Sequence, residues 1–176
     1  GTLPSPEVRI LEEATLAIKD KAIRKQIQLA FKHQADSICM NILIYIPNKK
    51  LMAPVFLGYN FAGNYLLYND PFILIDGKKE NELSEDSFEK FKTQKRGERT
   101  SRWAIEKIFE SGYGLVTLNY NDVDPDKNDF SDGIHSLFYN SYQIKPEDDQ
   151  WGSISAWAWG MSRVMDYLET ETLIDE

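Results

Sequence analysis

The sequence has little cysteine, little histidine and a deficit of positive charge. It contains one cysteine and two histidines among 176 residues. A single cysteine cannot form a disulfide within the chain, and it excludes a zinc site built on cysteines. The formal net charge is -8, from 28 acidic and 20 basic side chains. Because phosphate contacts need clustered lysine and arginine, this balance argues against binding to nucleic acid or to an anionic membrane surface.

Long apolar runs and a serine nucleophile motif are also missing. No run approaches the ~20 apolar residues that a membrane-spanning helix needs, and no Gly-x-Ser-x-Gly turn occurs anywhere in the sequence. Hydrophobic residues nevertheless make up 42% of the chain and aromatic residues 12%, which is enough apolar material for a core. With no repeat or linker in view, we expect one domain over 1–176.

The first quarter of the chain predicts two helices and then a strand. Residues 7–34 carry apolar side chains in a helix-like rhythm, so we expect two peripheral helices with His33 on a helix surface. Residues 36–47 alternate between apolar and polar, which predicts a strand that ends at Pro47. Cys39 lies among apolar neighbours in this strand, and we expect it to be buried.

Two short apolar runs, 54–58 and 114–120, predict strands that are buried on both faces. Between them lie a charged surface excursion over 76–102 and an amphipathic helix over 103–110, closed by Gly112 as a left-handed cap. Parallel neighbouring strands need a long crossover of this kind, so the two strands are predicted to be a parallel pair.

A long polar segment and a long helix follow the second of these strands. Residues 121–150 are acidic and show no period, which predicts a long loop at the carboxyl end of a strand, where open α/β sheets bind ligands. Residues 151–169 have apolar side chains at spacings of three and four and predict a helix. Trp157 falls on its buried stripe, while Trp151 at its start is free to face a cleft.

Neither the acidic nor the basic clusters predict an ion site. Alternating aspartates in 122–129 superficially resemble calcium ligands, but the glycine turn and the terminal glutamate of such a loop are missing at their required spacing. We interpret this segment as a solvated loop and expect no metal and no cofactor. Five basic residues are flanked by Glu89 and Glu98 and are interpreted as a solvated face rather than an anion site: Lys92, Lys95, Arg96, Arg99 and Arg102.

Three other features could carry chemistry. His135 and Ser136 could belong to a serine hydrolase system, but adjacent residues of an extended segment point apart, so a structural role for His135 is favoured. Trp151, Trp157 and Trp159 could stack against sugars, although at helical spacing such residues are more often core. The glycine- and asparagine-rich turn over 58–64 is typical of the loop that supplies oxyanion donors after a central strand.

An ordered series of motifs runs through most of the chain, from about Ile38 to Glu169. Its members are LGYNFAGN at 57–64, Arg102-Trp103, SGYG at 111–114, YNDVDPD at 120–126 and WGSISAWAWGMSR at 151–163. The series resembles the glucuronoyl esterases of carbohydrate esterase family 15, and also bacterial members labelled acetyl xylan esterases.

The resemblance implies an α/β fold, namely part of the three-layer α/β-hydrolase sandwich. The chain would hold the early strands of the central sheet with flanking helices and stop before the strand that carries the nucleophile. It also implies xylan degradation, in which a serine cleaves the ester between glucuronic acid on xylan and lignin alcohols. The serine, the acid and the histidine would lie beyond Glu176, so no catalytic residue is assigned and we expect no activity from the chain alone.

The resemblance further implies where substrate would lie. Asn60, Phe61, Gly63 and Asn64 would stand beside the nucleophile, with Asp122, Asp124, His135 and Trp151 near the rim of the cleft. The substrate would be a plant cell-wall ester of the glucuronoxylan type, and the protein would be secreted or periplasmic. The sequence begins at Gly1 with neither a signal peptide nor an initiator methionine, which is typical of a processed or engineered start.

A sheet built only from early strands exposes a parallel edge and the apolar face of the last helix. We therefore expect self-association or a complementary carboxy-terminal portion as the partner. An alternative interpretation is a non-catalytic α/β module, derived from an esterase, that binds carbohydrate or associates with itself.

Overall fold

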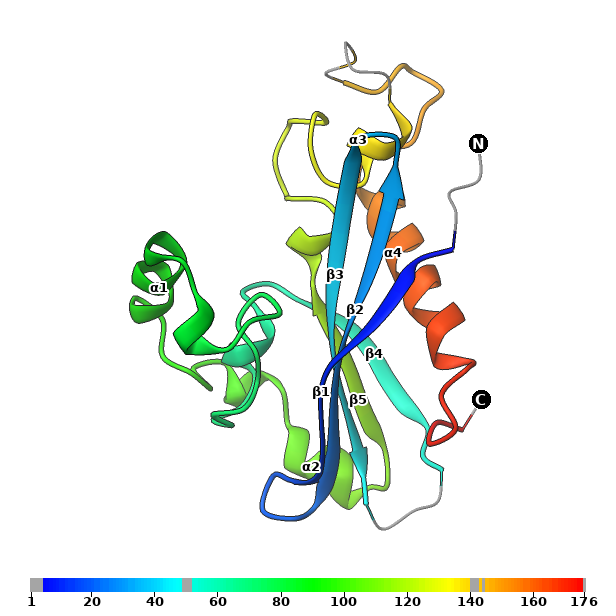
Figure 1. Cartoon of the computed structure of the whole chain (residues 1–176). Helices are drawn as coiled ribbons and strands as arrows, with labels where there is room; N and C mark the ends of the chain where they lie inside the picture. The colour runs from blue at the N-terminus through cyan, green and yellow to red at the C-terminus, as the bar shows by residue number, and fades with distance from the viewer. Residues whose placement is uncertain (1–4, 49–51, 140–142, 144, 176) are drawn as a thin grey trace.

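The computed structural model describes residues 5–48, 52–139, 143 and 145–175, and its centre is a mixed sheet of five strands. The strands lie in the order β1-β2-β3-β5-β4 (Figure 1). Their bounds are β1 Glu7–Ala17, β2 Ala22–His33, β3 Asp36–Pro47, β4 Val55–Asn60 and β5 Gly114–Asn119. β1 pairs with β2, β2 with β3 and β3 with β5, each pair antiparallel, whereas β4 and β5 are parallel. The predicted strand ending at Pro47 and the predicted parallel pair are confirmed.

The prediction of two helices in 7–34 is wrong, because this segment forms the long hairpin β1–β2. In β2, Ile27, Leu29 and Phe31 alternate along one buried face of the sheet. Arg24 and Gln26 are also buried, on the opposite face, where they find polar partners. A strand with polar side chains buried on one face loses the simple alternation by which strands are recognised. His33 is exposed, as predicted, but at the end of a strand.

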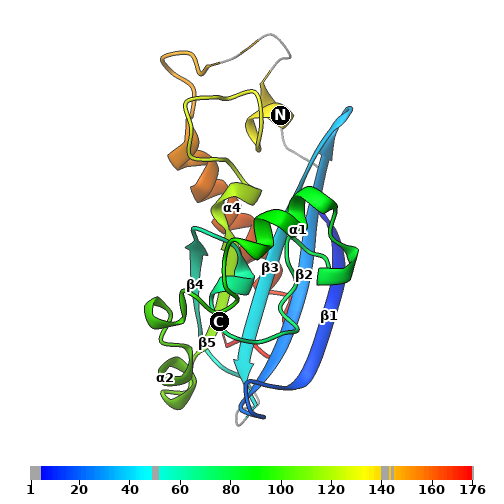
Figure 2. The same ribbon diagram turned by 90° about the vertical axis from the view of Figure 1, so that its left-hand side faces the viewer.

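Two hydrophobic clusters make the fold three-layered (Figures 1 and 2). One lies between the sheet and helix α4 (Ser153–Leu168), and it includes Val116 and Val164. The other lies on the opposite face, beneath helix α2 (Ile105–Glu110), and includes Leu43 and Phe109. Helix α1 (Glu85–Lys92) lies on the α2 side and buries no residue.

Helix α4 confirms the predicted helix, but it is rotated from the predicted face. The fully buried residues are Ala156, Gly160, Val164 and Leu168. A Cβ at Gly160 would lie 2.5 Å from the Tyr59 hydroxyl oxygen, so this face approaches the sheet closely. The small residues Ala156 and Gly160 allow this approach, while Trp157 is only partly buried and Ile154 is 79% exposed.

Cys39 is exposed, contrary to the prediction. Its neighbours Ile38 and Met40 both point into the α4-side cluster, so alternation along β3 turns Cys39 the other way. Gly112 has φ 79° and follows Ser111, the C-cap residue of α2, which confirms the predicted left-handed cap.

The two predicted surface segments contain short helical pieces. The excursion over 76–102 carries α1 and the 3-10 turns η2 (Glu80–Glu82) and η3 (Thr100–Arg102). η1 (Asn64–Leu66) precedes it. The loop over 121–150 carries α3 (His135–Phe138) and begins within η4 (Tyr120–Asp122), while 140–142 and 144 lie outside the described residues. Within the described ranges, no helix has the length and apolar content to cross a bilayer.

Candidate functional site

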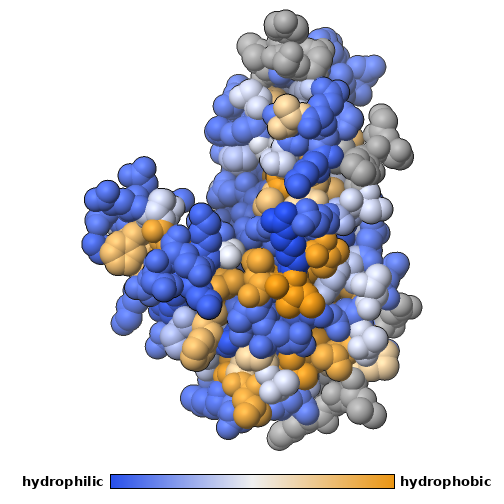
Figure 3. Space-filling view, in the orientation of Figure 1, coloured by the Kyte–Doolittle hydropathy of each residue, from blue (hydrophilic) through white to orange (hydrophobic). Residues whose placement is uncertain are grey.

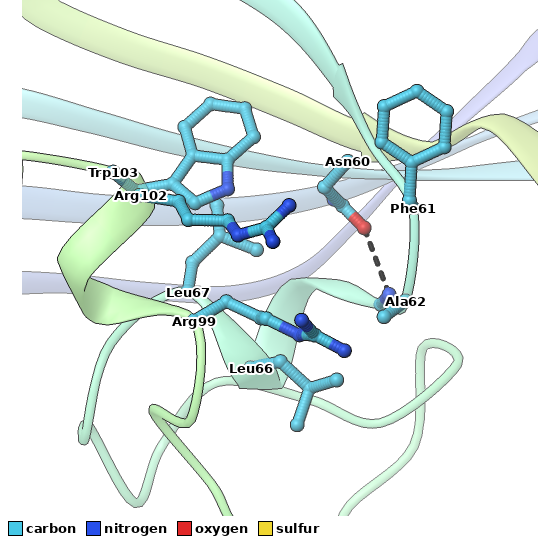
Figure 4. A pocket seen from close by; sticks show the side chains of 9 residues that line it. Asn60, Phe61, Ala62, Leu66, Leu67, Arg99, Arg102 and Trp103 are labelled. Atoms are coloured by element: carbon cyan, nitrogen blue, oxygen red, sulfur yellow. Dashed lines mark hydrogen bonds between the residues drawn. The ribbon is translucent and has the colours of Figure 1, made fainter.

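A pocket of about 210 Å³ lies at the carboxyl end of β4, where the chain leaves the sheet (Figure 4). Its lining joins the loop after β4 to the segment around η3, and consists of Asn60, Phe61, Ala62, Gly63, Leu66, Leu67, Arg99, Arg102 and Trp103. Three of the residues predicted to stand beside a nucleophile therefore line one cavity.

Asn60 holds the shape of the loop after β4. Its side chain is buried, and its Oδ1 accepts a hydrogen bond from the Gly63 N–H at 2.8 Å. The Asn60 Nδ2 donates to Asn64 Oδ1 at 2.7 Å and to Thr117 Oγ1 at 3.2 Å. Gly63 has φ 109°, and a Cβ there would lie 3.0 Å from the Tyr65 ring, so glycine is required at this position. Side-chain amides and one glycine therefore stabilise the conformation of this loop.

Phe61 is the exposed member of the same loop. It is 78% exposed, and its ring packs 5.2 Å from the ring of Tyr120 at the end of β5. Phe61 thus offers an apolar surface at the carboxyl edge of the parallel pair.

Asp122 joins this region through hydrogen bonds to β3. Its Oδ2 accepts from the Asn41 backbone N–H at 2.8 Å and from Asn41 Nδ2 at 3.2 Å. Asn64 Nδ2 donates to the Asn41 carbonyl at 2.9 Å, so Asn60, Asn64, Asn41 and Asp122 form one chain of hydrogen bonds. Removal of the Asp122 carboxyl from water, with a smaller contribution from the charge of Asp76, raises its pKa to about 7.

Asp124 and His135 form a separate buried pair. Both side chains have no exposed surface, and His135 Nδ1 lies 2.8 Å from Asp124 Oδ1. The indole of Trp151 stacks on the imidazole with ring centroids 4.6 Å apart, and Trp157 Nε1 donates to the Asp124 carbonyl at 2.8 Å. Asp124 and His135 thus lie inside the molecule, whereas Trp151 is half-buried over them.

The Asp124–His135 pair does not activate a serine. Ser136 Oγ donates to the Gly133 carbonyl at 2.9 Å rather than to the imidazole. Within the described ranges, His135 Nε2 is buried and has no hydrogen-bond partner. The arrangement orders the loop after β5, in keeping with a structural role for His135.

The aspartates further along this loop are paired with local groups. Lys127 Nζ lies 3.2 Å from Asp129 and 2.6 Å from Asp132. Hydrogen bonds from Ser131 and from Lys127 lower the pKa of Asp129 to about 2. In the part of the chain that the structure describes, no three acidic, histidine or cysteine side chains are grouped as metal ligands.

Comparisons with known proteins point to one group of enzymes. A family model described as glucuronyl esterase of fungi matches residues 100–176. Carbohydrate esterase MZ0003, from an unknown prokaryotic organism, is 39% identical over an alignment of 192 residues. The alignment covers 99% of this chain and 42% of the relative. The solved structure of a glucuronoyl esterase from Solibacter usitatus superposes with a TM-score of 0.81 at 35% identity, over 99% of this chain and 44% of the other.

This chain resembles the amino-terminal portion of the glucuronoyl esterases. A further solved structure, a promiscuous CE15 esterase from the marine bacterial metagenome, gives a TM-score of 0.70 at 38% identity over 98% of this chain and 44% of that one. The predicted fold class is confirmed, since the mixed sheet with flanking helices is similar to part of a glucuronoyl esterase fold. The chain spans less than half the length of these relatives.

Arg99 and Arg102 also line this pocket, although the sequence predicted them on a solvated face. Figure 4 shows both guanidinium groups extending in the same direction over the pocket, between Asn60 and Leu66. The basic cluster that contains them was the available signal, but the acidic residues beside it in sequence pointed to a solvated face.

Proposed function

We propose that the chain is the amino-terminal portion of a serine-type carbohydrate esterase of the glucuronoyl or acetyl xylan type. In this proposal it supplies the scaffold and one wall of an ester-binding cleft. The observation that carries the proposal is the superposition of almost the whole chain on less than half of a glucuronoyl esterase, with a shaped pocket at the carboxyl end of β4.

The loop after β4 fits the part that an esterase needs from this region. In α/β-hydrolases one oxyanion donor is an N–H from the loop that follows an early central strand. Ala62 lies in this loop and lines the pocket, and within the described ranges its N–H makes no hydrogen bond. Asn60 and Gly63 fix the loop shape, and we propose that the Ala62 amide donates to the developing oxyanion.

The serine, histidine and acid of the reaction belong to a further portion in this proposal. Serine attack on the ester carbonyl would give an acyl-enzyme that water then hydrolyses. No Gly-x-Ser-x-Gly turn is present in the sequence, and within the described ranges the buried His135 Nε2 makes no hydrogen bond. We therefore expect this chain alone to have no turnover.

The end of the described chain supports pairing with a further strand. Ile174 forms a parallel bridge with Ala53, just before β4, through the Ala53 N–H to the Leu173 carbonyl and the Asp175 N–H to the Ala53 carbonyl. A strand that continued this bridge would run along the outer edge of β4. We propose that a complementary carboxy-terminal portion, or failing that a second copy, occupies this edge.

A chimera tests the proposed function. The matched part of carbohydrate esterase MZ0003 would be replaced by this chain and assayed on a benzyl ester of glucuronic acid, beside this chain alone and native MZ0003. The proposal predicts turnover by the chimera and none by the chain alone. A well-folded chimera without turnover, or turnover by the isolated chain, would contradict it.

The substrate and the location belong to the same proposal. We propose a glucuronoxylan-type ester of plant cell walls as the substrate, and a secreted or periplasmic location, because a polymer of that size cannot enter a cell. The non-catalytic alternative is favoured by one observation, the absence of a nucleophile turn from the sequence. Retained binding to glucuronoxylan by a chain whose chimera is inactive would support that alternative.

A further inference from the structure

A second cavity lies at the end of the sheet where β2 turns into β3. Its volume is about 570 Å³. The lining joins that turn to the loop after β5, and it includes His33, Gln34, Asp36, Phe130, Phe138 and Tyr139. Figure 1 shows α3, which belongs to this loop, at the same end of the sheet. The volume falls within the range of cavities that bind small molecules, whereas the volume of the pocket after β4 lies below it.

The two cavities lie at the same end of the sheet. β3 is antiparallel to β5, so β3 begins on the side where β5 ends, and β4 runs parallel to β5. β5 lies between β3 and β4 in the strand order. The cavity beside the start of β3 and the pocket after β4 are therefore separate, and a polymer that lies across this end of the sheet can contact both.

The aromatic part of the lining is rigid. The Phe130 ring packs against the buried imidazole of His135, with ring centroids 4.9 Å apart and an interplanar angle of 87°. The Phe138 ring lies 5.3 Å from that of Trp151, and the Tyr139 hydroxyl donates to the Trp151 carbonyl. The three lining rings are only partly buried. They keep accessible surface in fixed positions, so a ligand that packs on them costs little conformational entropy.

The turn between β2 and β3 supplies polar groups without positive charge. His33, Gln34 and Asp36 are exposed and offer an imidazole, a carboxamide and a carboxylate. Among the described residues that line the cavity, none is lysine or arginine. The chain has a net charge of -8, so nothing here attracts an anion. Hydrogen-bonding groups beside accessible rings match a neutral sugar, whose hydroxyls donate and accept while the C–H faces of its ring are apolar.

We propose that this cavity binds neutral sugar units of a polysaccharide, at a site separate from the pocket after β4. The three aromatic rings pack against the faces of pyranose rings, and the side chains of the β2–β3 turn bind the hydroxyl groups. The choice of xylose among neutral sugars rests on the proposed function, whereas the sugar site itself rests on the lining of the cavity.

The test is an NMR titration of the ¹⁵N-labelled chain with xylotriose, xylitol and tetramethylammonium. We expect xylotriose to shift the amide signals of Gln34, Ser131 and Tyr139. Xylitol carries similar hydroxyl groups on an open chain, so it lacks the flat ring face and should leave these signals unchanged. Tetramethylammonium tests whether the rings and Asp36 instead hold an organic cation. Added salt should not weaken xylotriose binding, because a neutral ligand makes no ion pair.

Variants locate the binding. Phe130→Ala should weaken xylotriose binding roughly fivefold, because one packing surface is lost, and Phe130→Tyr should retain the affinity because it keeps the ring. Asp36→Ala should weaken binding about tenfold, the factor expected for a hydrogen bond to a charged group. Phe88→Ala is the matched control, because it removes a ring from α1, on the α2 side of the sheet, and should leave the affinity unchanged.

Several outcomes would overturn the proposal. Equal shifts with xylitol would show that the sugar ring is not recognised, and shifts with tetramethylammonium alone would make the cavity a cation site. Unchanged affinity in both Phe130→Ala and Asp36→Ala would place the binding elsewhere. Spectra of the unliganded variants show whether each is folded, and the exposed position of Asp36 keeps the test open if Phe130→Ala is not.

The titration and the chimera fail independently. An active chimera with no xylotriose binding would remove this site and leave the proposed function intact. Xylotriose binding with an inactive, well-folded chimera would keep the site and contradict the proposed function, because binding is measured without turnover.

Discussion

Asp122 shows how a single residue can make the stability of this fold depend on pH. Its carboxylate lies at the end of β5 and binds Asn41 of the neighbouring strand through two hydrogen bonds. Those hydrogen bonds favour the charged form, but the loss of water outweighs them, and its pKa rises to about 7. The polar network behind the candidate pocket therefore includes a carboxyl group that is easily protonated near neutral pH.

We expect Asp122→Asn to stabilise the chain at pH 8 and to have a smaller effect at pH 5. In the unfolded chain Asp122 titrates near ~3.9, so between that pH and about 7 the folded state binds more protons and stability falls as pH rises. The variant escapes this loss, and at pH 8 its free energy of unfolding should exceed that of the native sequence by about 1.4 kcal/mol or more, the equivalent of one pKa unit.

Urea denaturation at the two pH values measures this difference. Asp126→Asn, which changes an exposed aspartate of the same loop, is the control and should alter stability little at either pH. A difference between Asp122→Asn and the native sequence that stays constant from pH 5 to pH 8 would rule out the proposed titration.

The residue types and their order along the sequence predicted some of the residues that line the candidate pocket, but not the charge of the pocket. Asn60 and Gly63 could be recognised because a loop after a buried strand needs side-chain acceptors and a residue that tolerates positive φ. Arg99 could not, because it reaches the pocket through a backbone hydrogen bond to Leu66, far away in sequence. The placement of His135 inside the fold depends on Trp151, which lies on a later segment of the chain.

At the scale of elements, the parallel pair β4–β5 was predictable and the amino-terminal hairpin was not. β4 and β5 are short, apolar and bounded by turns, so their sequences admit few alternatives. β2 buries Arg24, which bonds Asp70 at 2.6 Å and Glu12 at 2.7 Å. Because these partners come from elsewhere in the chain, local sequence gives no sign that a charged residue can face inward there.

The turn between β1 and β2 is a strained element. Ile18, Lys19 and Asp20 have φ of 51°, 55° and 62°, although none is glycine. Side chains other than glycine adopt this left-handed conformation at a cost of roughly 1–2 kcal/mol each. The long hairpin that the turn connects holds the three residues in place.

We expect Lys19→Gly to stabilise the chain by up to about 1 kcal/mol, because glycine relieves the left-handed strain but loses more entropy on folding. Lys19 is exposed, and its ion pair with Glu106 at 3.7 Å is weak. Lys19→Ala removes the same side chain while keeping a Cβ, so it should not stabilise. Thermal unfolding of the three proteins distinguishes the cases, and equal gains for both variants would refute a conformational cause.

At the scale of the whole molecule, the two edges of the sheet are unlike. β1 is the edge strand on one side and is rich in charged residues, among them Glu7, Arg9, Glu12 and Glu13. Charges of this kind protect an edge from pairing with another chain. β4 is the opposite edge strand and carries the exposed Phe56, whose ring lies 5.0 Å from that of Tyr113.

Apolar side chains are exposed on several sides of the molecule. The face seen in Figure 3 is mainly hydrophilic, with apolar side chains gathered over its middle and lower parts. On α4, Ile154 is 79% exposed and Met165 is 48% exposed. An edge strand beside an exposed apolar helix face is the surface on which we propose that another portion or a second copy packs.

This surface predicts concentration-dependent self-association of the isolated chain. Sedimentation velocity should show a shift from monomer to larger species as concentration rises. Phe56→Lys and Ile154→Lys should each reduce that association, because a buried lysine would lose its hydration without gaining a partner. Val8→Lys is the matched control, since Val8 is 48% exposed on β1, and it should leave association unchanged.

A monodisperse monomer with a cooperative melt at every concentration would contradict the prediction, because it would show that β4 and α4 need no cover. Association abolished by Val8→Lys but not by Phe56→Lys would instead place the contact at the β1 edge.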